Sequence, residues 1–261
     1  MRYFLKLSYN GAQFHGWQSQ PNAVSVQSSI ENALEIICRR KISITGAGRT
    51  DTGVNARVMY AHFDCEKEIK DPNRFLLSLN SLVGRNISIE KILPVHDEAH
   101  ARFDATSRTY KYFITFSKNP FLHNLSWRSP SPLEVDKMNE AASFLLINQD
   151  FTSFAKLHSD VKTNICNVSH AHWSFISDDQ ESLDFIGFLN HGLVFTITAD
   201  RFLRNMVRAI VGTLVEVGRG KITPEDFNNI ILQKNRNAAG TSMPPEALFL
   251  WNITYPFALF E

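Results

Sequence analysis

A glycine-rich loop at residues 46–56, with the sequence GAGRTDTGVNA, places the strongest constraint on how this chain of 261 residues can fold. The runs on either side of it, 41–45 and 57–63, alternate in the manner of half-buried strands. Glycine permits backbone angles closed to other residues and lets a second backbone or a ligand approach closely. The loop is therefore expected where two strands meet, and it presents Arg49 and Asp51 beside open space.

Two phosphate-binding motifs are excluded at this loop by residue identity. A dinucleotide fingerprint needs a third glycine where Asp51 stands, and a Walker loop needs Gly-Lys followed by Ser or Thr. A tight turn in which Asp51 caps nearby amides stays open from these residues alone. The loop thus has two interpretations, a structural turn and a reactive carboxylate.

The order of the expected elements indicates an α+β fold. The first half reads β-α-β-β-α-β, which is the ferredoxin-like arrangement, with helices beginning at Val26 and at Asp71-Pro72. The second half repeats this order with insertions. Its expected elements are strands at 106–116, 167–175, 183–190, 193–199 and 248–255, and helices from Pro132 to about 147, at 202–217 and from Thr223.

Two α/β domains are expected, at 1–103 and 104–261, with the boundary near Phe103. Because no linker separates them, we expect one continuous, mostly antiparallel sheet with the active-site cleft between the two halves. On the 202–217 helix, Arg201, Arg204 and Arg208 are spaced three and four apart and should share one face.

Composition bounds the cellular setting. The chain is 44% hydrophobic and 20% charged, as in ordinary globular proteins, and its apolar stretches fall short of the ~18 residues that span a bilayer. Its three cysteines follow no paired spacing, which favours a reducing cytoplasm. The groups Cys166, His170, His172 and His62, Cys65 do not reproduce a zinc spacing, so no metal is expected. The net charge of +1 indicates no partner, whereas arginines inside the motifs favour a local anion-binding cleft.

Five ordered segments resemble the tRNA pseudouridine synthase A (TruA) family. The segments are residues 9–18 (YNGAQFHGWQ), 46–56, 103–112 (FDATSRTYKY), 202–208 (FLRNMVR) and 244–250 (PPEALFL). The chain departs from the family pattern at Asn10, Thr52, Asn55 and Ala247. The resemblance implies the pseudouridine synthase fold and an isomerase that needs neither cofactor nor metal, because it only breaks a C–N bond, rotates the uracil and forms a C–C bond.

The resemblance also implies roles for single residues. Asp51 would be the catalytic carboxylate, acting either as nucleophile at C1′ or as base at C2′, and Arg208 would pair with it and keep it anionic. Tyr110 would stack on the uracil and accept the C5 proton. Arg49 would assist extrusion of the uridine from its stem, and Arg204 would contribute to substrate binding. A core tyrosine and a solvated arginine face are the structural alternatives.

The expected substrate is the anticodon stem-loop of tRNA, at positions 38, 39 and 40, and the expected assembly is a homodimer. Contacts to tRNA are assigned to Ala99, His100, Ala101, Arg102 and Phe103, with Lys162 and Thr163 as further candidates. No membrane or nucleotide cofactor is expected as a partner. The alternatives are a relative that modifies other uridines and a catalytically silent RNA-binding protein.

Overall fold

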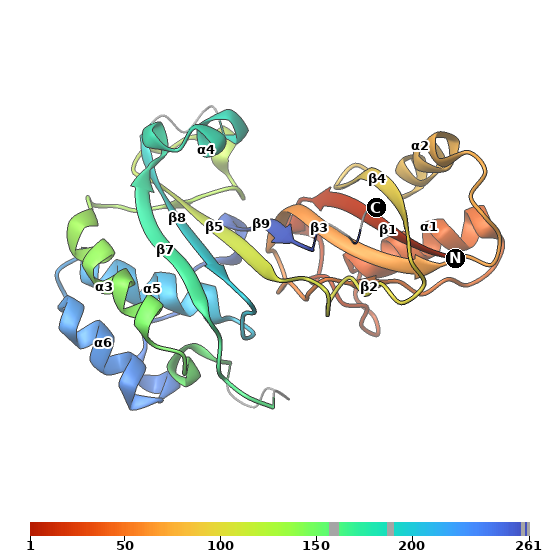
Figure 1. The fold of residues 1–261 in the computed structure, drawn as a ribbon. Helices are drawn as coiled ribbons and strands as arrows, with labels where there is room; N and C mark the ends of the chain where they lie inside the picture. The colour runs from red at the N-terminus through yellow and green to blue at the C-terminus, as the bar shows by residue number, and fades with distance from the viewer. Residues whose placement is uncertain (157–161, 187–190, 257–258, 260–261) are drawn as a thin grey trace. The chain divides into compact units, whose positions relative to one another are not determined.

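The computed structural model describes residues 1–156, 162–186, 191–256 and 259. The chain forms two compact units (Figure 1), of which unit 1 comprises Met1–Ser107 and Phe249–Glu261 and unit 2 comprises Arg108–Leu248. Both units combine strands with helices, which confirms the α+β class. The division at residue 103 stays a prediction, and the structure groups the segment from Phe249 onward with unit 1 rather than with the second half. No helix in the described part of the chain is long and apolar enough to cross a bilayer.

Unit 1 is built on a sheet in the order β4-β1-β3 with antiparallel neighbours. Short β2 lies antiparallel to the end of β3, and β9 lies parallel to its beginning. The strands are β1 (Arg2–Tyr9), β2 (Thr45–Gly46), β3 (Asn55–Asp64), β4 (Ile87–Val95) and β9 (Leu248–Thr254). The predicted strand at 41–45 is wrong except at its last residue, whereas the predicted β-α-β-β-α-β order is confirmed.

The two helices of unit 1 begin where side chains cap them. In α1 (Val26–Cys38), the Ser25 hydroxyl accepts from the Ser28 amide and completes a capping box. In α2 (Pro72–Leu82), the Asp71 carboxylate accepts from the Arg74 amide, and proline fills the first turn. The helices pack against each other, and α2 packs against β4. Both predicted helix starts are confirmed.

Unit 2 carries a sheet in the order β5-β8-β7, antiparallel throughout, with short β6 parallel to β5. Its strands are β5 (Ser107–Thr115), β6 (Trp127–Arg128), β7 (Val168–Phe175) and β8 (Gly192–Ala199). Its helices are α3 (Val135–Ile147), α4 (Gln180–Phe185), α5 (Met206–Gly218) and α6 (Pro224–Gln233). Helix α3 packs against β7, α5 and α6, which places these helices on one core.

Two predicted elements of unit 2 are wrong. The strand expected at 183–190 begins inside helix α4, because the Asp179 side chain accepts from the Ser182 amide and caps a helix there. Residues 187–190 of that strand lie outside the described part of the chain. The helix expected from residue 202 begins only at Met206, because Asn205 adopts the left-handed conformation with φ of 66°. Arg201 and Arg204 therefore precede the helix and do not share a helical face with Arg208.

Helix α5 is buried almost all round and is held by the segment 240–243. The Gly240 amide donates to the Thr213 hydroxyl at 2.9 Å, and the Met243 amide donates to the Arg208 carbonyl at 3.1 Å. A methyl group at Gly212 would overlap the carbonyl oxygen of Thr241. Glycine is therefore required at this position, because the opposing group is backbone and cannot rotate away.

Gly212→Ala should destabilise the protein, although Gly→Ala inside an exposed helix normally stabilises by about 1 kcal/mol. We expect a loss of about 1–3 kcal/mol in the free energy of unfolding, measured by urea denaturation, because the added methyl displaces the 240–243 segment. Gly218→Ala on the same helix should cost less, since its added methyl meets the flexible Met138 side chain. An unchanged or increased stability of Gly212→Ala would contradict this packing.

Candidate active site

The Asp51 loop connects β2 to β3 through a tight turn. The Ala47 amide donates to the Tyr60 carbonyl at 2.8 Å, and the Val54 amide donates to the Asp51 carbonyl at 3.1 Å. Gly53 has a φ of 79°, which places the residue in the left-handed region. These bonds fix the backbone on both sides of Asp51, whose side chain is half-buried.

Backbone groups of the amino-terminal segment hold the same loop. The Trp17 amide donates to the Thr50 carbonyl at 3.2 Å, and the Gly53 amide donates to the Phe14 carbonyl at 3.4 Å. The Thr50 hydroxyl is also hydrogen-bonded to the buried Tyr9 hydroxyl at 2.9 Å. The residues before and after Asp51 are thus both positioned by the 9–18 segment.

Close approach between these two segments depends on glycine. Gly16 has a φ of 89°, and a methyl there would lie 2.5 Å from the Thr50 carbonyl oxygen. The Gly11 amide donates to the buried Asn55 side chain at 2.8 Å. A methyl at Gly11 would overlap the Val54 carbonyl. Asn55, whose identity was unexpected from the sequence resemblance, is a buried acceptor for the amino-terminal segment.

Arg49 is exposed on the loop and tethered at one nitrogen. Its Nε donates to the Gln18 side chain at 3.1 Å, and Gln18 donates to Gln27 of α1 at 2.6 Å. Gln27 in turn donates to Glu31 at 2.9 Å. This chain of hydrogen bonds orients the guanidinium from the helix while leaving it at the surface, where it can meet a phosphate or a base.

Tyr110 lies on β5 of unit 2. It pairs in register with Ile197 of β8, and its half-buried ring meets the Phe202 ring edge-to-face at 5.1 Å between centroids and 85° between planes. Tyr112, two residues along the same strand, is fully buried and donates to the Pro244 carbonyl at 3.1 Å. Burial raises the pKa of Tyr112 well above its usual value, so that tyrosine stays a neutral donor.

Arg208 stands in the first turn of α5. Its Nε donates to the Met243 carbonyl at 2.6 Å, while the Met243 amide donates to the Arg208 carbonyl at 3.1 Å. This reciprocal pair fixes the direction of the half-buried guanidinium. Arg204 is exposed in the preceding loop, where its carbonyl accepts from the Lys156 amide at 3.1 Å.

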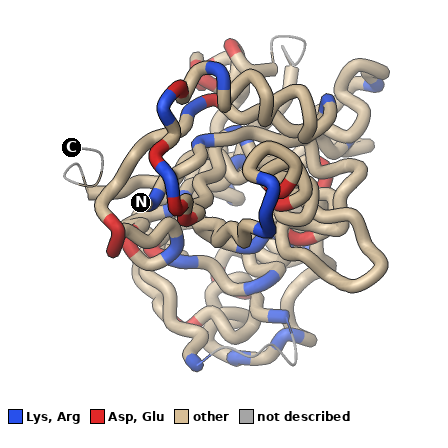
Figure 2. The backbone as a smooth tube through the Cα atoms, turned by 90° about the vertical axis from the view of Figure 1, so that its right-hand side faces the viewer, with Lys and Arg blue, Asp and Glu red and all other residues tan. Residues whose placement is uncertain are grey.

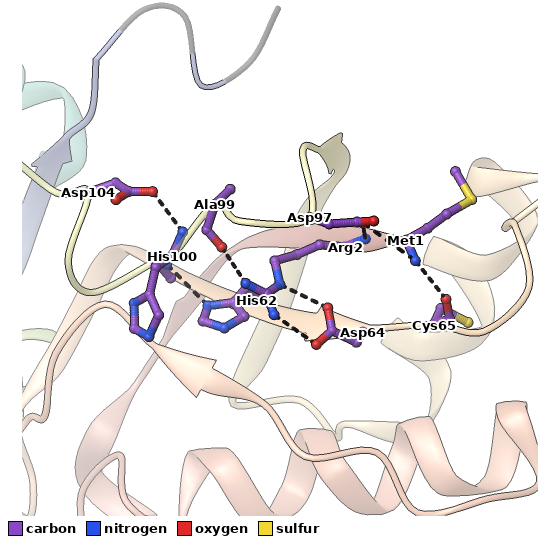
Figure 3. Close-up of polar contacts among 10 residues, drawn as sticks. Met1, Arg2, His62, Asp64, Cys65, Asp97, Ala99, His100 and Asp104 are labelled. Carbon is purple, nitrogen blue, oxygen red and sulfur yellow. Dashed lines mark hydrogen bonds and ion pairs between the residues drawn. The ribbon is translucent and has the colours of Figure 1, made fainter.

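The segment 99–103, predicted to contact RNA, is anchored in unit 1 (Figure 3). Arg2 donates to the Ala99 carbonyl at 2.9 Å, and the Ala101 amide donates to Nδ1 of His62 at 3.1 Å. His100 Nδ1 accepts from the amides that follow it, Arg102 at 3.1 Å and Phe103 at 3.2 Å. The segment therefore buries its two alanines and exposes Arg102 and Phe103.

The remaining two predicted contacts lie in unit 2. Lys162 and Thr163 are exposed, the Thr163 hydroxyl accepts from the Ile165 amide at 3.1 Å, and the Thr163 carbonyl accepts from Arg201 at 3.4 Å. Figure 2 shows Lys and Arg interspersed with Asp and Glu along the chain rather than gathered in one block.

The predicted catalytic residues are divided between the two units, and the structure reveals further residues that anchor the 99–103 segment. Arg49 and Asp51 share one loop of unit 1, while Tyr110, Arg204 and Arg208 belong to unit 2, so the pairing of Asp51 with Arg208 stays a prediction. Nothing in the sequence predicts which side chains anchor the 99–103 segment, and His62 is considered there only as part of a group that does not fit zinc. The anchors are Arg2, His62 and Tyr255, whose hydroxyl donates to the Ala101 carbonyl.

Comparison with known proteins identifies relatives over the whole chain. A family model described as tRNA pseudouridine synthase matches residues 141–256. A tRNA pseudouridine synthase A from Parabacteroides distasonis is 54% identical over 259 residues, covering 99% of this chain and 98% of the relative. Relatives with the same name from Bacteroides fragilis and Bacillus licheniformis are 52% and 36% identical, with at least 98% of each chain covered.

The chain belongs to the tRNA pseudouridine synthase A family. This confirms the relationship inferred from the five segments. Two of the segments that carry the family pattern, 9–18 and 46–56, are the two whose backbones interlock around Asp51. In this chain, the 9–18 segment therefore holds the Asp51 loop through hydrogen bonds to its backbone and to Asn55.

Gly16→Ala should disturb the Asp51 loop. Strain at a positive φ and the close contact to Thr50 should lower the free energy of unfolding by about 1–3 kcal/mol, and amide exchange at residues 50–54 should accelerate. Gly48→Ala is the matched control, because no atom lies within 4 Å of its added methyl and its φ is unstrained. Equal effects of the two substitutions in urea denaturation would contradict the described contact.

The pH dependence of stability should report on His62. Burial, with Arg2 and His100 nearby, lowers the pKa of His62 from 6.5 to about 4, so the unfolded chain takes up this proton at higher pH than the folded one. Its contribution is therefore fully present above pH 6.5 and is lost as the pH falls through 4, by up to about 3 kcal/mol. His62→Asn cannot titrate, so its free energy of unfolding should fall less over this range. Parallel stability curves for the two proteins would refute this assignment.

Proposed function

We propose that the protein is a tRNA pseudouridine synthase that isomerises uridine in the anticodon stem-loop. The observation that carries the proposal is the full-length similarity to tRNA pseudouridine synthases A, together with a carboxylate held by backbone bonds in the loop that carries the family pattern. Positions 38, 39 and 40 are the proposed targets. The reaction breaks the bond between C1′ and N1, turns the uracil, joins C5 to C1′ and removes the C5 proton.

Asp51 is proposed as the group that acts on the ribose, either as nucleophile at C1′ or as base at C2′. A carboxylate needs a fixed approach to the reacting atom, since displacement by about 1 Å can lower a rate 100-fold. The turn closed by Val54 and the bond from Trp17 supply that rigidity. The neighbouring Arg49 sits at the surface of the same loop, where it can hold the extruded nucleotide or fill the space that it leaves.

Tyr110 and Arg208 are the proposed partners of Asp51 in catalysis. The edge-to-face contact with Phe202 restricts the Tyr110 ring, which suits a ring that stacks on uracil and receives the C5 proton. The carbonyl of Met243 orients the Arg208 guanidinium, which is proposed to pair with the Asp51 carboxylate. Arg204, exposed in the loop before α5, is proposed to bind the substrate.

Contacts to the tRNA body are proposed for the segment 99–103 and for Lys162 and Thr163. The Arg102 guanidinium lies over the Phe103 ring at 5.6 Å, and Phe103 is 74% exposed, which is the combination that stacks on unpaired bases. His100, by contrast, uses Nδ1 to shape its own segment. A single site cannot easily both grip the tRNA body and reach the anticodon arm, so we also propose a homodimer.

We also propose a cytoplasmic location. Cys38, Cys65 and Cys166 are free thiols, as expected in a reducing compartment. A relative with the same chemistry on other uridines and a silent RNA-binding protein remain the alternatives. Mapping the modified positions separates the first of these from the anticodon-arm enzyme.

Release of tritium from tRNA labelled at uridine C5 tests the proposal. Wild type should release tritium, and Asp51→Asn, which keeps the size and hydrogen-bonding ability of the side chain, should lower the rate at least about 1,000-fold. The affinity for tRNA should persist, since the carboxylate does not supply the phosphate contacts. Asp136→Asn, an exposed carboxylate at the start of α3, is the matched control and should keep full activity.

Two results would overturn this assignment. Wild type that binds tRNA without releasing tritium would indicate the silent RNA-binding protein. Asp51→Asn with an activity near that of wild type would leave the isomerase but remove Asp51 from its mechanism. Binding itself should weaken as salt is raised, because phosphate contacts release counterions.

A further inference from the structure

The segment 99–103 is held at its two buried alanines, Ala99 and Ala101, by side chains of distant elements. Arg2 from β1 donates to the Ala99 carbonyl, and its other donors bind Asp64 at 2.8 Å each. His62 from β3 accepts from the Ala101 amide at 3.1 Å, and the Tyr255 hydroxyl binds the Ala101 carbonyl at 2.5 Å. Both backbone groups of Ala101 are therefore satisfied by side chains rather than by a strand.

His62 is well defined in this arrangement. The side chain is only 6% exposed, and its ring stacks on Phe4 with 6.0 Å between centroids. Because Nδ1 accepts from an amide, the ring is neutral and carries its proton on Nε2. Arg2 and His100 nearby disfavour a second proton, while Asp64 and Asp104 favour one, and burial decides for the neutral ring.

A row of rings connects this buried histidine to the surface. His62 meets His100 edge-to-face at 4.7 Å, and His100 stacks on Phe103 at 4.2 Å. The Arg102 guanidinium lies over the other end of this row, 5.6 Å from the Phe103 ring centre. Figure 3 shows His62 and His100 as neighbours, with Asp104 bonded to the His100 backbone. A shift of His62 would therefore move the platform that Phe103 and Arg102 form.

We propose that His62 is a positioning residue for RNA binding, which fixes the segment 99–103 so that Arg102 and Phe103 meet the tRNA in one orientation. The proposal rests on the proposed function, because it takes tRNA as the ligand of this segment. His62 itself touches no substrate in this scheme. It acts by lowering the conformational freedom that Arg102 and Phe103 would otherwise lose on binding.

The matched variants are His62→Asn and His62→Gln in the full-length protein. Both are neutral amides, but the Asn oxygen falls near the position of Nδ1, whereas the Gln oxygen falls one atom further out. Steady-state kinetics on a tRNA transcript should give His62→Gln a KM raised about five- to tenfold, the size of one lost hydrogen bond, with kcat within twofold of wild type. His62→Asn should keep a KM near that of wild type. Amide exchange at Ala101 should accelerate in the Gln variant only.

A double-mutant comparison separates positioning from general destabilisation. In a protein that already carries Arg102→Ala and Phe103→Ala, His62→Gln should have no further effect on KM, because the groups that it positions are absent. Leu79→Ala, a cavity in α2 on the same unit, is the control for stability and should leave KM unchanged at temperatures where it remains folded. An equal rise of KM for His62→Gln in both backgrounds would overturn the proposal, as would an unchanged KM in the wild-type background.

The outcomes for the two proposals are distinguishable. If wild type forms no pseudouridine, the proposed function fails, and tRNA affinity measured by filter binding replaces KM in the same set of variants. If wild type is active but His62→Gln lowers kcat alone, the isomerase stands and the positioning role is wrong. A third result would reject the role of the Nδ1 acceptor. It is a raised KM for His62→Asn although amide exchange at Ala101 in that variant is as slow as in wild type.

Discussion

The bond from the Trp17 amide to the Thr50 carbonyl is the interaction on which the candidate site most depends. It ties the amino-terminal segment to the residue directly before Asp51, and the positive φ of Gly16 makes the approach possible. A loop has few neighbours of its own and would otherwise sample many conformations. Here backbone hydrogen bonds join the 9–18 segment to the Asp51 loop. These bonds hold the loop to the strands beside it and limit the motion of the carboxylate. The chemistry of the proposed reaction requires such a fixed carboxylate.

Much of the fold could be predicted wherever local chemistry decides it. Helices capped by Asp71 and Thr223 were located correctly, because the cap and the proline act within one turn of the chain. The start of α5 could not be found in this way. It depends on the left-handed Asn205, whose side chain binds Ser242 at 2.6 Å across 37 residues. The apolar run within helix α4 predicts a strand, because a run this short fits either structure and only the Asp179 cap decides for the helix.

In the candidate site too, residues marked by a local pattern could be predicted, whereas contacts between distant residues could not. Glycines and the family pattern single out Asp51, Tyr110 and Arg208 from the sequence. The anchors of the 99–103 segment escape such reasoning, because Arg2 and His62 lie 97 and 39 positions away from the residues that they bind. The alternating pattern of a strand predicts that His62 lies on a buried face, but it does not predict which group His62 binds. The pairing of β1 with β3 brings Phe4 beside His62, and only the folded structure shows that His62 accepts from the Ala101 amide.

The reciprocal bonds between Arg208 and Met243 have a consequence for the evolution of the chain. Inserting or deleting one residue between 240 and 243 would rotate the Met243 carbonyl away from the guanidinium and would also break the contact of Gly240 with Thr213. The length of this stretch is therefore set by the helix beside it. Divergence within the family should accumulate there by exchange of exposed side chains such as Thr241, and not by changes in loop length.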